Sequence, residues 1–293
     1  MPRATCLLRT VGHVTSSSRA SAWVESPLQL VCAVEYAAAS GIPLRVVPRA
    51  GAAQLAATAK RLDELGLPVG VEISSPRTLP PTGAAHLVVG DLFSGVVQAS
   101  IAMRMPQRLT VVDDGADSLR LPSALEGVLP LSRDGAASAI AVLARARIRA
   151  LDAAGDLELF SYYDLDHPAA VRNRFGWLRT RGTTGWDGAT IVLGAAAVAD
   201  GLVPEGRYLD WLASRPAGAV YLPHRRERGT TVSAAALLGL TVVEPGIPVE
   251  LALLGSQRLT ISTLASSAAD TLRILLHGSD SQVQVDSLVA RAA

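Results

Sequence analysis

Short apolar segments alternate with helix-like segments along almost the whole chain of 293 residues, and this alternation limits the folds available to it. Runs such as HLVV and LTVV are typical of buried strands, whereas AAQLAATAKRLDELG is typical of a helix. Strands that alternate with helices form parallel sheets. The sequence therefore predicts the α/β class, and its length favours two domains over one.

The same pattern predicts the individual elements. Ser26 fits the N-cap of a first helix, Pro27 its first position and Gly41 its C-cap. Strands are expected at 22–25, 43–48, 86–91, 109–112, 189–195, 219–224, 240–244 and 259–264, and helices at 26–40, 52–66, 94–105, 204–214, 231–240, 249–256 and 266–278.

The stretch RTRGTTGWDG, residues 179–188, is the expected division between the domains. We expect a leader at residues 1–20, an N-terminal Rossmann-like domain at 21–180 and a C-terminal one at 187–293. Two such domains facing a cleft are the GT-B arrangement, in which ligands bind at the carboxyl ends of the strands.

Composition excludes some classes of function. With 27 basic and 26 acidic residues, the chain lacks the charge excess of a nucleic-acid-binding protein. The arginines at 145–149 are interpreted as a solvated helix face. Cys6 and Cys32 form no CxxC motif and suit a reducing compartment. No apolar run is long enough to span a bilayer and no secretory signal is evident, so we expect a cytoplasmic protein, compatible with peripheral association at the inner face of the membrane.

Two acidic residues, Asp113 and Asp114, follow the strand LTVV and precede Gly115. Carboxylates at a strand's carboxyl end lie where open α/β sheets bind ligands, and one of the two could act as a general base. An Asp-Gly turn that merely closes the strand explains the pattern equally well.

A basic motif follows the strand AVY. His224 stands beside Arg225 and Arg226, and this combination suits an anionic group such as a phosphate. The alternative is a surface loop in which Glu227 starts a helix.

Two further candidates lie at expected helix starts. Glu250 could bind the two hydroxyls of a ribose, although the helix dipole alone also favours a carboxylate there. Ser266 and Ser267 could bind a phosphate with the free N–H groups of the helix, although simple N-capping also explains them.

Two other patterns of acidic residues are less specific. Asp164 and Asp166 resemble the DxD pair that holds a divalent ion in another glycosyltransferase fold, which keeps a metal-dependent sugar transferase as an alternative. Gly90 and Asp91 are interpreted as a strand-end turn.

Taken together, SPLQLVCAVEY, VVDDG, IVLGAAAVADGLVPEGRYLDWL, YLPHRRE, PGIPVELALL and TLASSAADTL occur in an order that resembles bacterial sialyltransferases, the lipooligosaccharide sialyltransferases and capsule polysialyltransferases. The resemblance covers roughly residues 21–275. It implies an inverting, metal-independent glycosyltransferase that needs no cofactor. Its substrates would be a CMP-activated nonulosonic acid, such as sialic acid, and a glycan or glycolipid acceptor.

The resemblance also implies roles for single residues. Asp113 would be the general base, with Asp114 as supporting partner or alternative, and His224 would act on the donor phosphate. Glu250 would hold the ribose, and Ser266 and Ser267 the phosphate. Ser26 and Arg225 are expected to contact substrate as well. A non-catalytic relative that only binds nucleotide or glycan is the alternative from another class.

Overall fold

The computed structural model describes residues 20–133, 138–182 and 185–288. The expected leader, residues 1–20, lies outside this range except for its last residue. Ala20 already belongs to the first strand, which ends at Val24 and so begins and ends earlier than expected.

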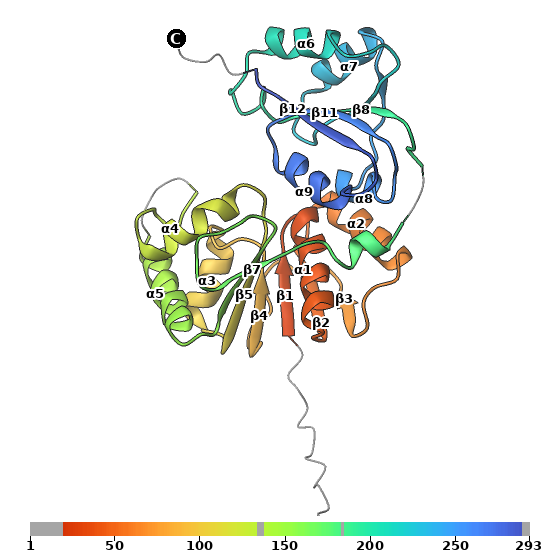
Figure 1. Cartoon of the computed structure of the whole chain (residues 1–293). Coiled ribbons are helices and arrows are strands. Elements are labelled where there is room, and N and C mark those ends of the chain that lie inside the picture. The colour runs from red at the N-terminus through yellow and green to blue at the C-terminus, as the bar shows by residue number, and fades with distance from the viewer. Residues whose placement is uncertain (1–19, 134–137, 183–184, 289–293) are drawn as a thin grey trace, which may run out of the picture.

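Two parallel sheets organise the described residues (Figure 1). Both begin with the strand order 3-2-1-4-5 of dinucleotide-binding folds, counted within each sheet. The first sheet is ordered β3 (Val71–Ile73), β2 (Leu44–Pro48), β1 (Ala20–Val24), β4 (His86–Val89), β5 (Arg108–Val112), β6 (Leu157–Ser161) and β7 (Ala170–Arg172). The second is ordered β10 (Thr241–Val242), β9 (Val220–Leu222), β8 (Thr190–Leu193), β11 (Thr260–Leu264) and β12 (Gln282–Asp286). The predicted α/β class with parallel sheets is confirmed. That the two halves are the domains of a GT-B enzyme, divided at 179–188, stays a prediction.

Helices cover both faces of each sheet. The alternation along β1 shows why, since Ala22 and Val24 face one core and Trp23 the other. In the first half, α1 (Pro27–Ser40) and α2 (Ala53–Glu64) cover one face, and α3 (Gly95–Met103), α4 (Leu121–Glu126) and α5 (Ala139–Ala153) the other. In the second half, α6 (Glu205–Ala213) and α7 (Gly229–Leu237) cover one face, and α8 (Val249–Ala252) and α9 (Ser267–Leu275) the other. Two 3-10 helices, η1 (Asp117–Arg120) and η2 (Leu178–Thr180), lie in connections.

Helix α1 begins and ends as its sequence predicts. The Ser26 hydroxyl accepts the backbone N–H of Gln29, and Pro27 occupies the first helical position. Gly41 closes the helix at φ +68°, in the left-handed region that glycine adopts without strain. The short connection between β1 and α1 places Ser26 at the carboxyl end of β1.

The two halves share a packed seam. Leu251, Leu254 and Leu275 come from the α8–α9 region of the second half, yet they are buried in the same core as α1. The views agree in placing α8 and α9 between the two sheets (Figure 1). On the connecting segment, the backbone N–H groups of Trp177 and Leu178 both donate to the buried Glu35 carboxylate of α1. The halves are thus joined by side-chain packing as well as by the chain.

No helix among the described residues is both long and apolar enough to cross a membrane.

Candidate functional site

A pocket of about 710 Å³ lies between the carboxyl ends of the two sheets. In each sheet the strand order reverses beside the first strand, between β1 and β4 and between β8 and β11. Open α/β sheets bind ligands at such switch points, because the connections there leave in opposite directions and open a crevice. Ser26 follows β1, Gly194 follows β8, and Ser266 lies just beyond β11. The pocket is of ordinary ligand size.

Most of the residues predicted from the sequence come together here. The lining includes Ser26, Asp114, His224, Arg225, Glu250, Ser266 and Ser267. Asp113 is not among them, and neither are Asp164 and Asp166, which are exposed elsewhere.

The preferred general base, Asp113, is misplaced for that role. Its side chain is buried, with the residue 1% exposed, and points into the first half. Its Oδ1 accepts the Ser161 hydroxyl at 2.6 Å, and its Oδ2 accepts the Tyr162 N–H at 2.7 Å. Burial raises the pKa of Asp113 to about 6 against these hydrogen bonds. Since neighbouring residues at a strand end point to opposite sides, Asp113 braces β5 against β6, and only Asp114 reaches the pocket.

Asp114 is the carboxylate of this pair that lines the pocket. Its Oδ1 accepts the Ser26 hydroxyl at 3.2 Å, and its Oδ2 accepts Arg133 Nη2 at 3.1 Å. Burial and the negative charge of Asp91 raise the pKa of Asp114 to about 6. The side chain is 18% exposed, so the carboxylate remains partly open to the pocket, and its raised pKa makes it a better proton acceptor than an ordinary aspartate.

Asp91, interpreted from the sequence as a turn residue, belongs to the surroundings of this carboxylate. It is 3% exposed, and its Oδ2 accepts the same Arg133 Nη2 at 2.6 Å. Burial raises the pKa of Asp91, and the bond to Arg133 lowers it. One guanidinium thus joins the carboxylates that follow β4 and β5. The sequence indicates this position of Asp91 only in that the residue follows the apolar strand HLVV, as Asp114 follows LTVV.

The N-terminus of α9 faces the Asp114 turn from the other half. Gly115 adopts φ +77°, and a Cβ placed on it would lie 3.4 Å from the Ser267 hydroxyl. Ser266 is the N-cap of α9 and accepts the N–H of Ala269 at 3.4 Å. The capping interpretation therefore holds for Ser266, while its hydroxyl hydrogen can still serve a ligand. A phosphate here would meet two hydroxyls and the positive end of a helix.

Glu250 lies on α8, lines the pocket and is 5% exposed. The Thr271 hydroxyl of α9 donates to its Oε1 at 2.7 Å. Burial raises the pKa of Glu250, and this hydrogen bond lowers it. The Glu250 carboxylate is thus tied to α9, the helix that also carries Ser267.

His224 stands at the end of β9 in a braced loop. Its backbone N–H donates to Glu227 Oε2 at 2.7 Å, and its Nδ1 accepts the N–H of Arg226 at 3.2 Å. Burial and the charges of Arg225 and Arg226 lower the pKa of His224. We infer from these contacts a neutral ring that carries its proton on Nε2, ready to donate to an anion.

Two contacts of the loop that carries His224 could not be predicted from the sequence. Glu227 is not a helix start, because α7 begins at Gly229 with Arg228 as its N-cap. Its Oε1 instead accepts the hydroxyls of Tyr208 and Tyr221, at 2.6 and 2.5 Å. The Arg226 side chain pairs with Asp200, so Arg225 is the arginine of this motif that lines the pocket.

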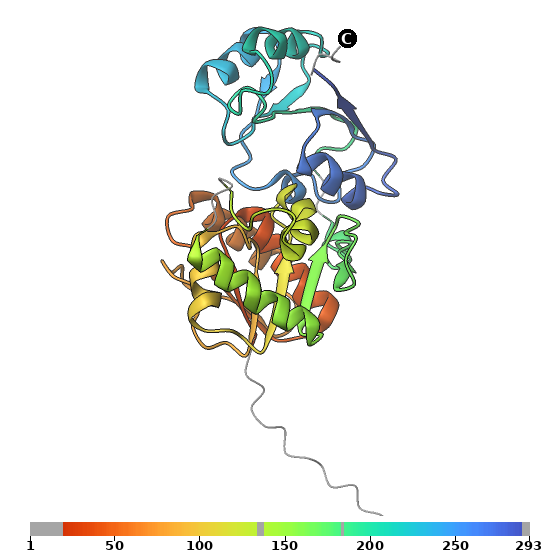
Figure 2. The ribbon, with the colours of Figure 1, turned by 90° about the vertical axis from the view of Figure 1, so that its left-hand side faces the viewer.

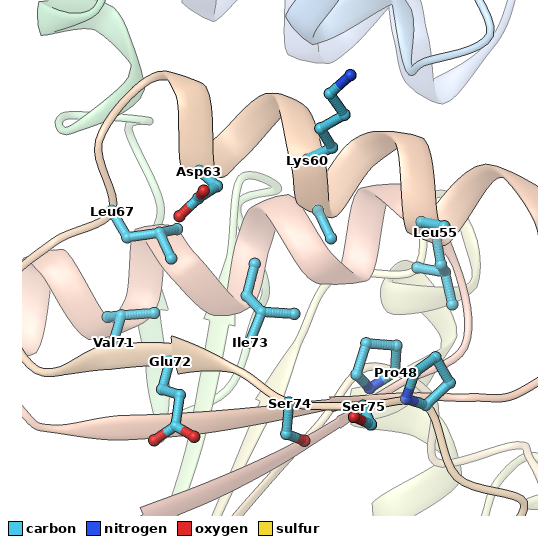
Figure 3. A pocket seen from close by; sticks show the side chains of 13 residues that line it. Pro48, Leu55, Lys60, Asp63, Leu67, Val71, Glu72, Ile73, Ser74 and Ser75 are labelled. Carbon is cyan, nitrogen blue, oxygen red and sulfur yellow. The ribbon is translucent and has the colours of Figure 1, made fainter.

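A second hollow of about 600 Å³ lies between α2 and β3 (Figure 3). Its lining is largely apolar, with Leu55, Leu67, Val71 and Ile73 turned inward and Lys60 extended away. It holds none of the predicted site residues. Among the residues that the structure describes, no group of three or more His, Cys, Asp or Glu side chains is placed to hold a metal ion.

Fold and pocket define a class: two parallel α/β halves with the strand order of nucleotide-binding folds and a shared pocket at their switch points. No protein-family model and no curated protein matches the sequence. Among solved structures, the chain is similar to a UDP-glucosyltransferase from Polygonum tinctorium, described as capable of glucosylating indoxyl and solved in complex with 3,4-dichloroaniline. The TM-score is 0.41 at 11% identity, over 94% of this chain and 88% of that one. A likeness this distant carries no information about substrates.

Proposed function

We propose that the chain is an inverting glycosyltransferase that moves sialic acid or a related nonulosonic acid from a CMP-sugar to a hydroxyl of a glycan or glycolipid, without a metal or other cofactor. The observation that carries the proposal is the opposition of Asp114 on the first half to the Ser266–Ser267 helix start on the second, across one pocket. A base and an anion site must face each other in this way for direct displacement.

In the proposed reaction, the acceptor hydroxyl attacks the anomeric carbon of the donor while the carbon–oxygen bond to the phosphate of CMP breaks. Asp114 takes the proton of the acceptor hydroxyl. The helix start at Ser266 and Ser267, with Nε2–H of His224, stabilises the negative charge left on the departing phosphate. Attack from the side opposite the phosphate inverts the anomeric centre.

The remaining lining residues fit the other parts of the substrates. Glu250 would accept hydrogen bonds from the ribose hydroxyls. Arg225 carries an exposed guanidinium suited to the carboxylate of a nonulosonic acid. Ser26, which already donates to Asp114, would hold the Asp114 carboxylate toward the acceptor.

Calorimetric titration with CMP, with UMP and UDP as controls, all in EDTA, tests the donor site. We expect selective CMP binding that the pair Ser266→Ala and Ser267→Ala weakens at least tenfold, while Ser40→Ala at the far end of α1 leaves it unchanged. Preference for a UDP nucleotide that requires a divalent ion would overturn the proposal and favour the metal-dependent alternative. CMP binding without any release of sugar from the donor would favour the non-catalytic one.

A further inference from the structure

Helix α5 has an unusual outward face. The helix buries Ala141, Ala144, Ile148 and Leu151 against the first sheet. Its first turns nevertheless expose three large apolar side chains: Ile140 at 49%, Val142 at 51% and Leu143 at 45%. In Figure 2 the helix runs diagonally across the outside of the molecule. Solvated helix faces are normally polar, so this face calls for a partner.

Arginines flank Val142 and Leu143 of this apolar strip on both sides, and Ile140 lies at the start of the helix on the side of Arg147. Arg145 and Arg149 are four residues apart and follow Val142 along one edge of the helix, whereas Arg147 lies four residues beyond Leu143 on the other. Arg147 donates to the carbonyl of Ile101, and Arg145 and Arg149 have no ion pair with any residue that the structure describes. The one acid of α5, Asp152, lies three residues beyond Arg149, and its Oδ2 is 3.5 Å from His167 Nε2. The helix therefore carries three arginines against one acid.

The position of the strip also matters. Since α5 leads into β6 of a parallel sheet, its N-terminal end lies at the sheet's carboxyl edge, the edge that carries Asp114. The loop after α4 approaches the helix here, because a Cβ placed on Gly127 would lie 3.5 Å from Arg145 Nη1. The next residue, Val128, is 73% exposed and adds an apolar side chain close to the strip.

We propose that the outward face of α5, made of Ile140, Val142, Leu143, Arg145, Arg147 and Arg149, binds the surface of an anionic lipid bilayer. Apolar side chains would enter the headgroup region, and the arginines, with their long stems, would pair with lipid phosphates on either side. A strip of mixed apolar and cationic groups matches a bilayer surface, which offers both environments within one side-chain length. Such binding would turn the pocket edge of the first half toward the membrane. The inference does not depend on the proposed function.

The full-length chain should co-sediment with vesicles of phosphatidylcholine and phosphatidylglycerol, and much less with phosphatidylcholine alone. Added salt should weaken the binding. We expect the pair Arg145→Gln and Arg149→Gln, and separately Val142→Ser with Leu143→Ser, to reduce the partition coefficient roughly tenfold or more. The control, Lys60→Gln on α2 with Arg77→Gln just after the edge strand β3, should bind like the wild type.

Three outcomes would overturn the proposal. The first is a wild-type chain that ignores anionic vesicles, and the second is an α5 variant that is folded by circular dichroism and binds as the wild type does. The third is a wild-type dimer in size-exclusion chromatography that becomes a monomer when Val142 and Leu143 are replaced, because the strip would then serve a second copy of the chain.

Discussion

The backbone N–H of His224 donates to Glu227 Oε2 at 2.7 Å, and the other oxygen of this carboxylate accepts two tyrosine hydroxyls. Tyr208 lies on α6 and Tyr221 on β9, so one half-buried carboxylate ties the His224 loop to two elements of the second half. The orientation of His224 in the pocket therefore depends on Glu227, the last residue of the YLPHRRE segment.

Replacement of Glu227 by glutamine should loosen this loop. An amide offers only one acceptor oxygen, so at least one of the three donors loses its partner, at a cost of about 1–3 kcal/mol in unfolding free energy. CMP affinity should fall more than in Tyr208→Phe, which removes one donor and keeps the carboxylate. Thermal unfolding and CMP titration measure the two effects, and equal CMP affinity in both variants would contradict the positioning role.

Gly194 should tolerate no side chain. A Cβ there would lie 2.2 Å from Glu227 Oε2 and 2.6 Å from the backbone nitrogen of His224. Gly194→Ala is expected to displace the loop, destabilise the fold by about 1–3 kcal/mol and abolish CMP binding. Gly206→Ala is the control, because that glycine lies in α6 with open space around it and should gain about 0.5–1 kcal/mol. A fully stable Gly194→Ala variant with intact binding would refute the clash.

The rate of sugar transfer should rise with pH through about 6, the pKa to which burial and Asp91 raise that of Asp114. A base acts only when deprotonated, so the rate is lost below this value. Asp91→Asn removes the neighbouring charge and should move the acid limb to lower pH. Asp114→Asn should lower kcat by a factor of about 100 or more, whereas Asp164→Asn should not. A pH profile unchanged in Asp91→Asn would remove the coupling.

Stability should fall as pH rises from about 5 to 8. Burial raises the pKa of Glu35 to about 7 and that of Asp113 to about 6, so the folded state holds protons that the unfolded chain releases. This stabilisation is complete below the ordinary carboxyl pKa and is lost above the raised values. Glu35→Gln should flatten the dependence by on the order of 2 kcal/mol, measured by denaturant unfolding across pH. A slope identical to the wild type would contradict it.

The alternation of strands and helices could be read from the sequence because buried parallel strands are continuous apolar runs. Four strands were not predicted, the edge strands β3, β7 and β12 and the internal strand β6. The segment QVQVD of β12 alternates polar and apolar residues, and β7 has three residues, two of them exposed. Helix α5 was expected only through the arginines at 145–149, interpreted as a solvated helix face, and its bounds were not predicted, because its outward apolar residues blur the helical period.

The sequence predicted those site residues that follow a strand or begin a helix. Ser26, His224, Glu250, Ser266 and Ser267 all line the pocket because topology brings carboxyl edges together. The choice between Asp113 and Asp114 was beyond the sequence, since it depends on which way β5 is turned. The roles of Asp91 and Glu227 were also hidden, because their partners lie 42 residues away and on a different strand and helix.

Helix α9 takes part both in the pocket and in the packing between the two halves. Its first turn offers Ser266 and Ser267 to the pocket, while Leu275 near its last turn is embedded in the core of the other half. Small sliding of packed helices is one of the ways in which two parts of a protein close around a ligand. A ligand bound at the start of α9 would therefore also affect the packing of Leu275 between the halves. We expect the cleft to open by a small shear of α9 over α1, and a bound ligand to shift the equilibrium of that motion.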